Sequence, residues 1–176
     1  MGKVVITGVE TTLGRRVARL AAGEDGADVV GLARATVAGL PARVSVYRVD
    51  PASDDVKPHL EHADAVVHLA TSAPAGPTAP TDDVAVARRV LDAAGDMGVA
   101  HVVVLSSAVV YGAWADNPGP LTEDATLRPN PGFAFAAERA EIERLTAEWR
   151  DAHPGRPYAD QANRLSAESA DDSPTS

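Results

Sequence analysis

The feature that most constrains the fold of this chain is a regular alternation of short, β-branched apolar runs with longer segments of helical periodicity. Apolar runs without a polar face are typical of strands buried in a parallel sheet. Five such runs cover residues 3–7, 27–33, 43–49, 63–70 and 100–107. Helical patterns cover residues 13–23, 82–98 and 132–150. Because strand–helix alternation implies right-handed crossovers, the sequence predicts an α/β domain with a doubly wound parallel sheet of about five strands.

Size and charge limit the classes of partner. The 176 residues suffice for one domain with a real core, and the formal net charge is −9. The basic residues are scattered, which argues against nucleic acid and against an anionic membrane surface as partners. The chain has no long apolar run and begins like a strand rather than a signal peptide, so a cytoplasmic protein is expected. Cysteine is absent, which excludes disulfides and thiolate chemistry, and no metal site is predicted.

The composition changes near residue 150. The segment HPGRP (153–157) is a cluster of helix breakers, and the acidic, Ser-rich end of the chain has no apolar period. The sequence therefore predicts one domain over residues 1–150. Residues 151–176 are expected to form a disordered or loosely packed tail, with no further strand.

A glycine-containing turn, TGVETTLG, follows the first predicted strand. Gly8 and Gly14 occupy the outer positions of a dinucleotide-binding fingerprint, in which the N-terminal amides of the next helix attract a pyrophosphate. Thr11 stands where a full fingerprint has its middle glycine. Its branched side chain narrows the approach of a ligand, although its hydroxyl could donate to a phosphate oxygen. A plain turn between strand and helix is the alternative interpretation.

Two further positions bear on a nucleotide. At the end of the second strand, where an acidic residue would hold an adenosine ribose, the chain has Ala33 followed by Arg34. Arg34 could face a 2′-phosphate, which favours NADP slightly over NAD; it could equally be a solvated loop residue. Asp50, after the third strand, could meet an adenine amino group or simply form a turn before Pro51. The Pro-rich segment 71–81 follows the fourth strand, at the sheet edge where ligands bind in such folds.

In order along the chain, these motifs resemble the extended short-chain dehydrogenase/reductase family, of the NAD-dependent epimerase/dehydratase type. The resemblance covers residues 1 to about 150, and its most specific block is VLSSAVVYG (104–112). It implies a Rossmann-type domain that binds NAD or NADP. By that resemblance, Leu13, Leu69, Ala70 and Ser106 border the cofactor and His68 is a packing residue.

Members of that family are similar in using a Ser, a Tyr and a Lys, often with an Asn from the preceding helix. In this chain the serine position corresponds to Ser107, four residues before Tyr111. The Tyr and Lys positions correspond to Phe135 and Arg139, and the Asn position to Asp83. By that resemblance, we expect the family's C-terminal substrate-binding region to be absent from this chain.

These departures change the expected chemistry. A phenol next to an ammonium group can exchange a proton with a substrate hydroxyl, whereas a phenyl ring cannot, and an arginine is not equivalent to a lysine. We therefore expect a dinucleotide-binding domain that lacks the usual hydride chemistry and whose binding is weakened or altered. The apolar surface left without its C-terminal half favours a homodimer or a docking partner. The alternative is a small non-redox enzyme, catalysing an isomerisation, dehydration or cyclisation with Ser107, Tyr111, Asp83 or Glu138.

Overall fold

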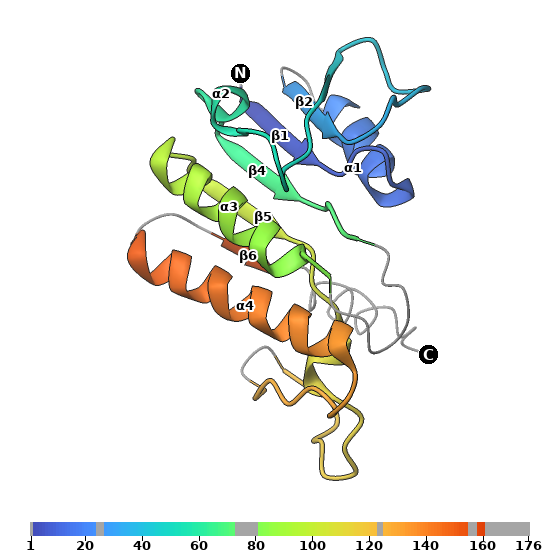
Figure 1. The fold of residues 1–176 in the computed structure, drawn as a ribbon, viewed down its shortest axis with the longest axis vertical. Coiled ribbons are helices and arrows are strands. Elements are labelled where there is room, and N and C mark those ends of the chain that lie inside the picture. Colours follow the sequence, from blue (N-terminus) through green and yellow to red (C-terminus); the bar gives the residue numbers. More distant parts are fainter. Residues whose placement is uncertain (1, 24–26, 73–80, 123–124, 155–157, 161–176) are drawn as a thin grey trace, which may run out of the picture.

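The computed structural model describes residues 2–23, 27–72, 81–122, 125–154 and 158–160 (Figure 1). These residues form a single sheet with helices on both of its faces. The strands are β1 (Lys3–Thr7), β2 (Asp28–Ala33), β3 (Val44–Arg48), β4 (Ala65–His68), β5 (His101–Val104) and β6 (Tyr158–Asp160). All pairings are parallel, and the strand order is β3-β2-β1-β4-β5-β6. The predicted doubly wound parallel sheet is confirmed.

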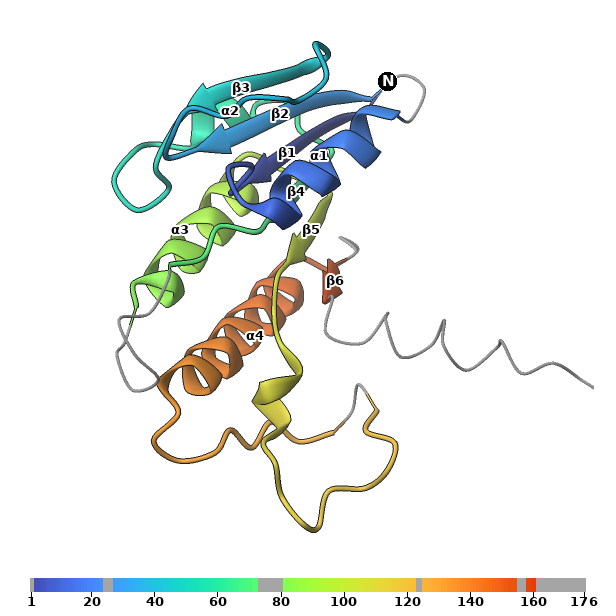
Figure 2. The same ribbon diagram turned by 90° about the vertical axis from the view of Figure 1, so that its right-hand side faces the viewer.

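The helices are α1 (Thr12–Gly23), α2 (Lys57–Leu60), α3 (Asp83–Asp96) and α4 (Ala134–Ala152), with the 3-10 turn η1 (Ala108–Tyr111) after β5. Figure 2 shows α1 on one face of the sheet and α3 with α4 on the other. The helices α3 and α4 run side by side across the front of Figure 1. The short elements α2 and η1 were not predicted, because four residues are too few to establish a helical period.

The core has two parts, one on each face of the sheet. Successive residues of a strand point to opposite faces, so Val5 packs under α3 and α4 while Ile6 packs under α1. Both side chains are completely buried. The edge strand β3 differs, since its residues 45–48 are exposed. Burial on both faces explains why the inner strands are continuous apolar runs.

The end of the chain corrects one expectation. The helix α4 extends to Ala152, and Tyr158, Ala159 and Asp160 pair with Val102, Val103 and Val104 of β5. The sequence predicted no strand after residue 150, because three residues carry no detectable alternation. Residues 161–176, the larger part of the predicted tail, lie outside the described residues. Among the described helices, none combines the length and apolar character needed to cross a membrane.

Candidate functional site

The candidate site is a pocket of about 200 Å³ at the carboxyl edge of the sheet. In a parallel sheet the loops after successive strands meet at this edge, and here the loops after β2, β3 and β4 meet the start of α3. The pocket is lined by Arg34, Asp50, Pro51, Ala52, Ala70, Thr71, Ser72, Asp82, Asp83 and Val86. Four predicted site residues, Arg34, Asp50, Ala70 and Asp83, are therefore brought together from four separate segments.

Two positions of the turn between β1 and α1 are packed too closely for any side chain. Gly8 has a φ of 75°, and a Cβ on it would lie 2.7 Å from the amide nitrogen of Ala70. A Cβ on Gly14 would lie 2.1 Å from the carbonyl oxygen of Gly8. Both glycines are thus required by the close packing of the turn itself.

Thr11 caps the helix that follows. Its Oγ1 accepts from the amide of Gly14 at 2.9 Å and donates to the carbonyl of Gly8 at 2.8 Å. The hydroxyl hydrogen predicted for a phosphate is therefore already used within the turn. Thr12 and Leu13 are the first residues of α1, and the first amides of a helix have no acceptor within the helix. These two amides can therefore donate hydrogen bonds to an anion. The side chain of Leu13 is 38% exposed beside them.

The two predicted adenosine contacts both have protein partners. Arg34 donates from Nε to Oε1 of Glu10 at 3.1 Å and from Nη2 to the carbonyl of Thr71 at 3.1 Å. Asp50 accepts the amide of Ala52 at 3.0 Å, the turn contact given as its alternative role. Both side chains nevertheless form part of the pocket wall.

Thr7 organises the end of β4. Its Oγ1 accepts the amides of Leu69 and Ala70 at 3.2 and 3.3 Å, and it lies 2.8 Å from Nδ1 of His68. Leu69 is 1% exposed, so its side chain belongs to the core. Burial lowers the pKa of His68 to about 4, aided by the positive charge of Arg139. His68 is therefore a neutral packing residue.

The predicted catalytic positions on α3 and α4 form one buried ion pair. Nη2 of Arg139 donates to Oδ2 of Asp83, and their side chains are only 3% and 4% exposed. The other oxygen of Asp83 accepts the amide of Ser72 at 2.8 Å. The guanidinium carbon of Arg139 also lies 5.2 Å from the centre of the Phe135 ring, a cation–π distance. The charges at these positions are thus directed at each other.

Ser106 and Ser107 begin the segment between β5 and η1. Ser106 donates to Glu143 of α4, and Ser107 precedes η1, with its Oγ facing the amide of Val109 at 3.5 Å. Tyr111 ends η1 and is 4% exposed, and η1 packs against α4. The predicted serine and tyrosine therefore lie next to the helix that carries Phe135 and Arg139.

Glu138 was also considered as an acid–base group. Its carboxylate accepts both the amide and the hydroxyl of Thr81, the latter at 3.0 Å. These contacts hold the start of α3 against α4. A non-redox role for Glu138 or Ser107 stays a prediction, and the contacts found give each of them a structural task.

Glu10 was missed by the sequence-based assignment of the site. It lies inside the glycine turn and contacts Arg34, which was assigned. An acidic residue in a turn expected to face phosphates is unusual on electrostatic grounds, and that signal could have identified it.

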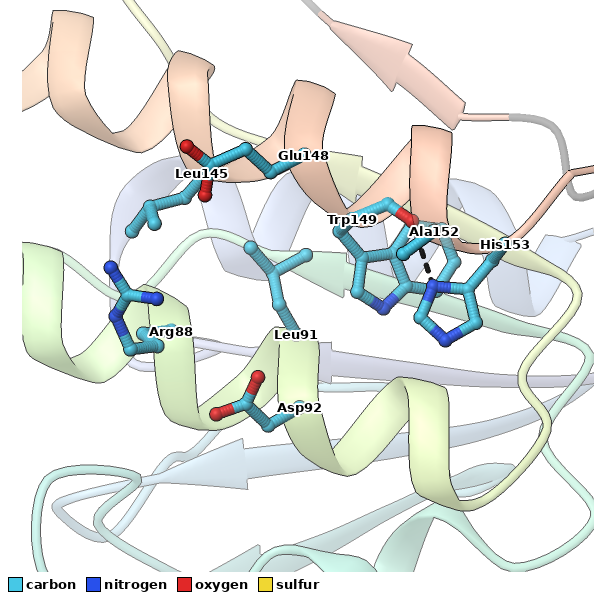
Figure 3. Close-up of a pocket in the computed structure, with 8 residues that line it drawn as sticks. All are labelled: Arg88, Leu91, Asp92, Leu145, Glu148, Trp149, Ala152 and His153. Atoms are coloured by element: carbon cyan, nitrogen blue, oxygen red, sulfur yellow. Dashed lines mark hydrogen bonds between the residues drawn. The ribbon is translucent and has the colours of Figure 1, made fainter.

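A second pocket of about 200 Å³ lies between α3 and α4, away from the predicted site residues (Figure 3). The rings of Trp149 and His153 stack there at 4.6 Å, and His153 Nδ1 donates to the carbonyl of Trp149 at 2.7 Å. Leu91 and Leu145 form its apolar floor, with charged groups around them. Within the described residues, no group of three or more His, Asp or Glu residues is arranged to hold a metal ion.

Comparison with known proteins identifies a family and a fold. The model of the NAD dependent epimerase/dehydratase family matches residues 4–159. A search of curated protein sequences found no match.

Solved structures with the same fold include two sugar-nucleotide epimerases and a dehydratase. UDP-glucuronic acid 4-epimerase from Bacillus cereus, in complex with UDP-glucuronic acid and NAD, is 18% identical with a TM-score of 0.75, over 90% of this chain and 55% of that one. UDP-N-acetylglucosamine 4-epimerase from Methanobrevibacter ruminantium is 20% identical with a TM-score of 0.75, over 90% and 53%. TunA, an NAD-dependent NDP-hexosamine 5,6-dehydratase, is 26% identical with a TM-score of 0.73, over 91% and 54%. This chain spans about half the length of these proteins.

Proposed function

This chain belongs to the NAD dependent epimerase/dehydratase family, and from that membership we propose that it binds a nicotinamide adenine dinucleotide without performing hydride transfer. The dinucleotide would lie along the carboxyl edge, from the pocket beside Asp50 to the glycine turn. The chain would then act as a binding module rather than as a dehydrogenase, epimerase or dehydratase.

The residues at the carboxyl edge fit the adenosine and pyrophosphate parts of such a ligand. Gly8 and Gly14 let the backbone of the turn pack closely, and the amides of Thr12 and Leu13, at the start of α1, could donate to a diphosphate. The neighbouring pocket, with Asp50 and Ala70 in its wall, offers space for an adenine. Proteins of the same fold have been solved with NAD, which supports a nicotinamide dinucleotide as the ligand.

The buried pair between Arg139 and Asp83 is the observation that carries the proposed loss of chemistry. A base that accepts the proton of a substrate hydroxyl must be able to change its protonation state. Phe135 has no titratable group, and the arginine guanidinium stays protonated in proteins. Because Asp83 already binds Arg139 and Ser72, this carboxylate is also engaged. These positions therefore support packing better than proton transfer.

Dinucleotide binding can be tested without disturbing the fold. Leu13→Glu places a negative charge at the predicted diphosphate position, and an acidic residue in the first turn of a helix is itself favourable. We expect this variant to bind NADH at least about tenfold more weakly than the unchanged protein, because like charges repel. Leu20→Glu is the matched control, since Leu20 is 65% exposed on the same helix. Binding is measured by NADH fluorescence; equal affinity in both variants would contradict the proposed position.

The loss of chemistry is tested by restoring the side chains of the family. In Phe135→Tyr combined with Arg139→Lys, the lysine would still lie beside Asp83, a carboxylate where the family often has an asparagine. We expect no reduction of NAD or NADP at 340 nm with this double variant on any of a panel of UDP-sugars. Turnover by the unchanged protein would refute the proposed binding role, whereas turnover by the double variant alone would show that these two side chains are what blocks hydride transfer. A protein that is folded by circular dichroism yet binds neither NADH nor NADPH would refute the proposed ligand.

A further inference from the structure

Arg34 is held by two different loops. Its Nε donates to Glu10 in the glycine turn after β1, and its Nη2 donates to the carbonyl of Thr71 after β4. The side chain is 42% exposed, so one side of the guanidinium still faces the solvent and the pocket. An arginine that binds a 2′-phosphate needs its positive charge free for that anion. Here the charge is already offset by a carboxylate at 3.1 Å.

Glu10 is the more buried partner of this pair. Its side chain is 19% exposed, and its second oxygen, Oε2, is buried with no hydrogen-bond partner among the described residues. A carboxylate oxygen without a donor is costly to bury, so a donor supplied by a ligand would stabilise it. A ribose hydroxyl is such a donor, whereas a fully ionised phosphate is not.

Glu10 can supply the acidic side chain that is absent from the end of β2. Ala33 occupies the position from which an acidic side chain would hold the ribose hydroxyls, and Ala33 directly precedes Arg34. Glu10 is not itself part of the pocket wall, but its carboxylate is held next to Arg34, which lines the pocket. The carboxylate reaches this position from the turn after β1 instead of from the end of β2.

We propose that Glu10 is the specificity-determining residue of the dinucleotide site, and that it selects NAD over NADP. Its carboxylate, positioned by Arg34, accepts a hydrogen bond from a hydroxyl of the adenosine ribose and repels a 2′-phosphate. Arg34 acts here as a positioning residue and not as a phosphate receptor. This inference rests on the proposed function and deepens it, because it names which of the two dinucleotides the site takes.

The test compares the affinities of the full chain for NADH and NADPH by isothermal titration calorimetry. We expect NADH to bind at least about tenfold more tightly than NADPH, because the 2′-phosphate carries extra negative charge toward a carboxylate. Glu10→Gln keeps the shape and removes the charge, and it should reduce that ratio at least about tenfold. Arg34→Gln removes the guanidinium that positions Glu10, so it should weaken the binding of NADH, and it should not selectively weaken NADPH as the loss of a phosphate receptor would. Glu141→Gln changes the net charge equally at an exposed ion pair on α4, and it should leave the ratio unchanged.

The possible outcomes separate this inference from the proposed function. If the unchanged protein binds both dinucleotides equally, or prefers NADPH, the role of Glu10 is refuted while dinucleotide binding stands. The same holds if Glu10→Gln leaves the ratio unchanged, or if Arg34→Gln selectively weakens NADPH. If the folded protein binds neither dinucleotide, both the proposed function and the selectivity are refuted.

Discussion

Asp83 and Arg139 join the first turn of α3 to the second turn of α4 through a buried ion pair. Removing two charges from water carries a large desolvation cost, which their mutual attraction and further hydrogen bonds must offset. Asp83 gains such a bond from the amide of Ser72, while Nε of Arg139 has no partner among the described residues. The pair therefore adds little net stability while it is intact, and its main effect on stability is the penalty for losing one partner and leaving the other charge buried alone.

Removing either charge alone should strongly destabilise the fold. We expect Asp83→Ala or Arg139→Ala to lower the free energy of unfolding by about 3–5 kcal/mol, because each leaves an uncompensated buried charge. The double variant should cost no more than either single change, since no charge is then left unpaired. Urea denaturation measures all three. As a control, Arg144→Ala breaks an exposed pair with Glu141 and should cost less than about 1 kcal/mol.

His68 should make stability depend on pH in the acidic range. Its pKa is about 4 in the folded protein, against 6.5 as the ordinary value. Above pH 6.5 His68 is neutral in both the folded and the unfolded protein, and its contribution to the free energy of unfolding is fully present. As the pH falls from 6.5 toward 4, only the unfolded state takes up the proton, so roughly 3 kcal/mol of stability is lost.

Denaturation curves between pH 4 and 7 check this dependence. His68→Gln removes the titrating group, so its stability should fall less steeply with decreasing pH than that of the unchanged protein. His101→Gln is the control, because His101 is exposed at the start of β5 and should leave the slope unchanged. Identical slopes in all three proteins would show that His68 titrates normally.

At the scale of elements, α1 depends on the close approach of its first turn to the strand before it. Gly14→Ala would place a methyl group 2.1 Å from the carbonyl oxygen of Gly8 and 2.8 Å from Cα of Val9, both backbone atoms that cannot move aside easily. We expect a loss of about 3 kcal/mol in the free energy of unfolding. Gly23, at the other end of α1, has no described atom within 4 Å of an added Cβ.

Gly23→Ala is therefore the matched control for Gly14→Ala. Alanine has a higher helix propensity than glycine, so this variant should be as stable as the unchanged protein or more stable by up to about 1 kcal/mol. Thermal unfolding followed by circular dichroism measures both. Equal losses in the two variants would mean that the cost arises from helix α1 in general and not from the glycine turn.

Most elements could be predicted from local pattern alone. Each of the five predicted strands and three predicted helices starts within two residues of the observed start. Apolar periodicity and flanking glycines are sufficient for this, because they reflect which face of an element is buried. The elements that were missed, α2, η1 and β6, have only three or four residues, so they carry no period.

For the whole molecule, β6 extends the described sheet beyond the predicted boundary near residue 150. A chain ending after residue 154 would lose the pairing of β6 with β5 and expose the edge of a buried strand. We expect it to be less stable by roughly 2 kcal/mol, the size of a few lost backbone hydrogen bonds, and to aggregate more readily. A chain ending after residue 160 keeps β6 and loses only the acidic, Ser-rich segment, whose composition predicts no packed structure. Its stability should equal that of the full chain.

Urea denaturation and light scattering of the two shortened chains test this boundary. If both have the stability of the full chain, β6 contributes nothing and the domain ends near residue 150. If both are equally destabilised, the segment beyond residue 160 takes part in the fold.

The sequence by itself determined the α/β class, the parallel sheet, the glycine turn and the family resemblance. These follow from local patterns, namely the period of apolar residues and the backbone freedom of glycine, which act wherever the segment lies. Only the tertiary structure decided how the charged residues are used. Arg34 meets Glu10, 24 positions away, and Arg139 meets Asp83, 56 positions away. A charged side chain can be solvated, bound to a ligand or paired, and nothing local distinguishes these states. Which of them occurs depends on the loops and helices that the fold brings together.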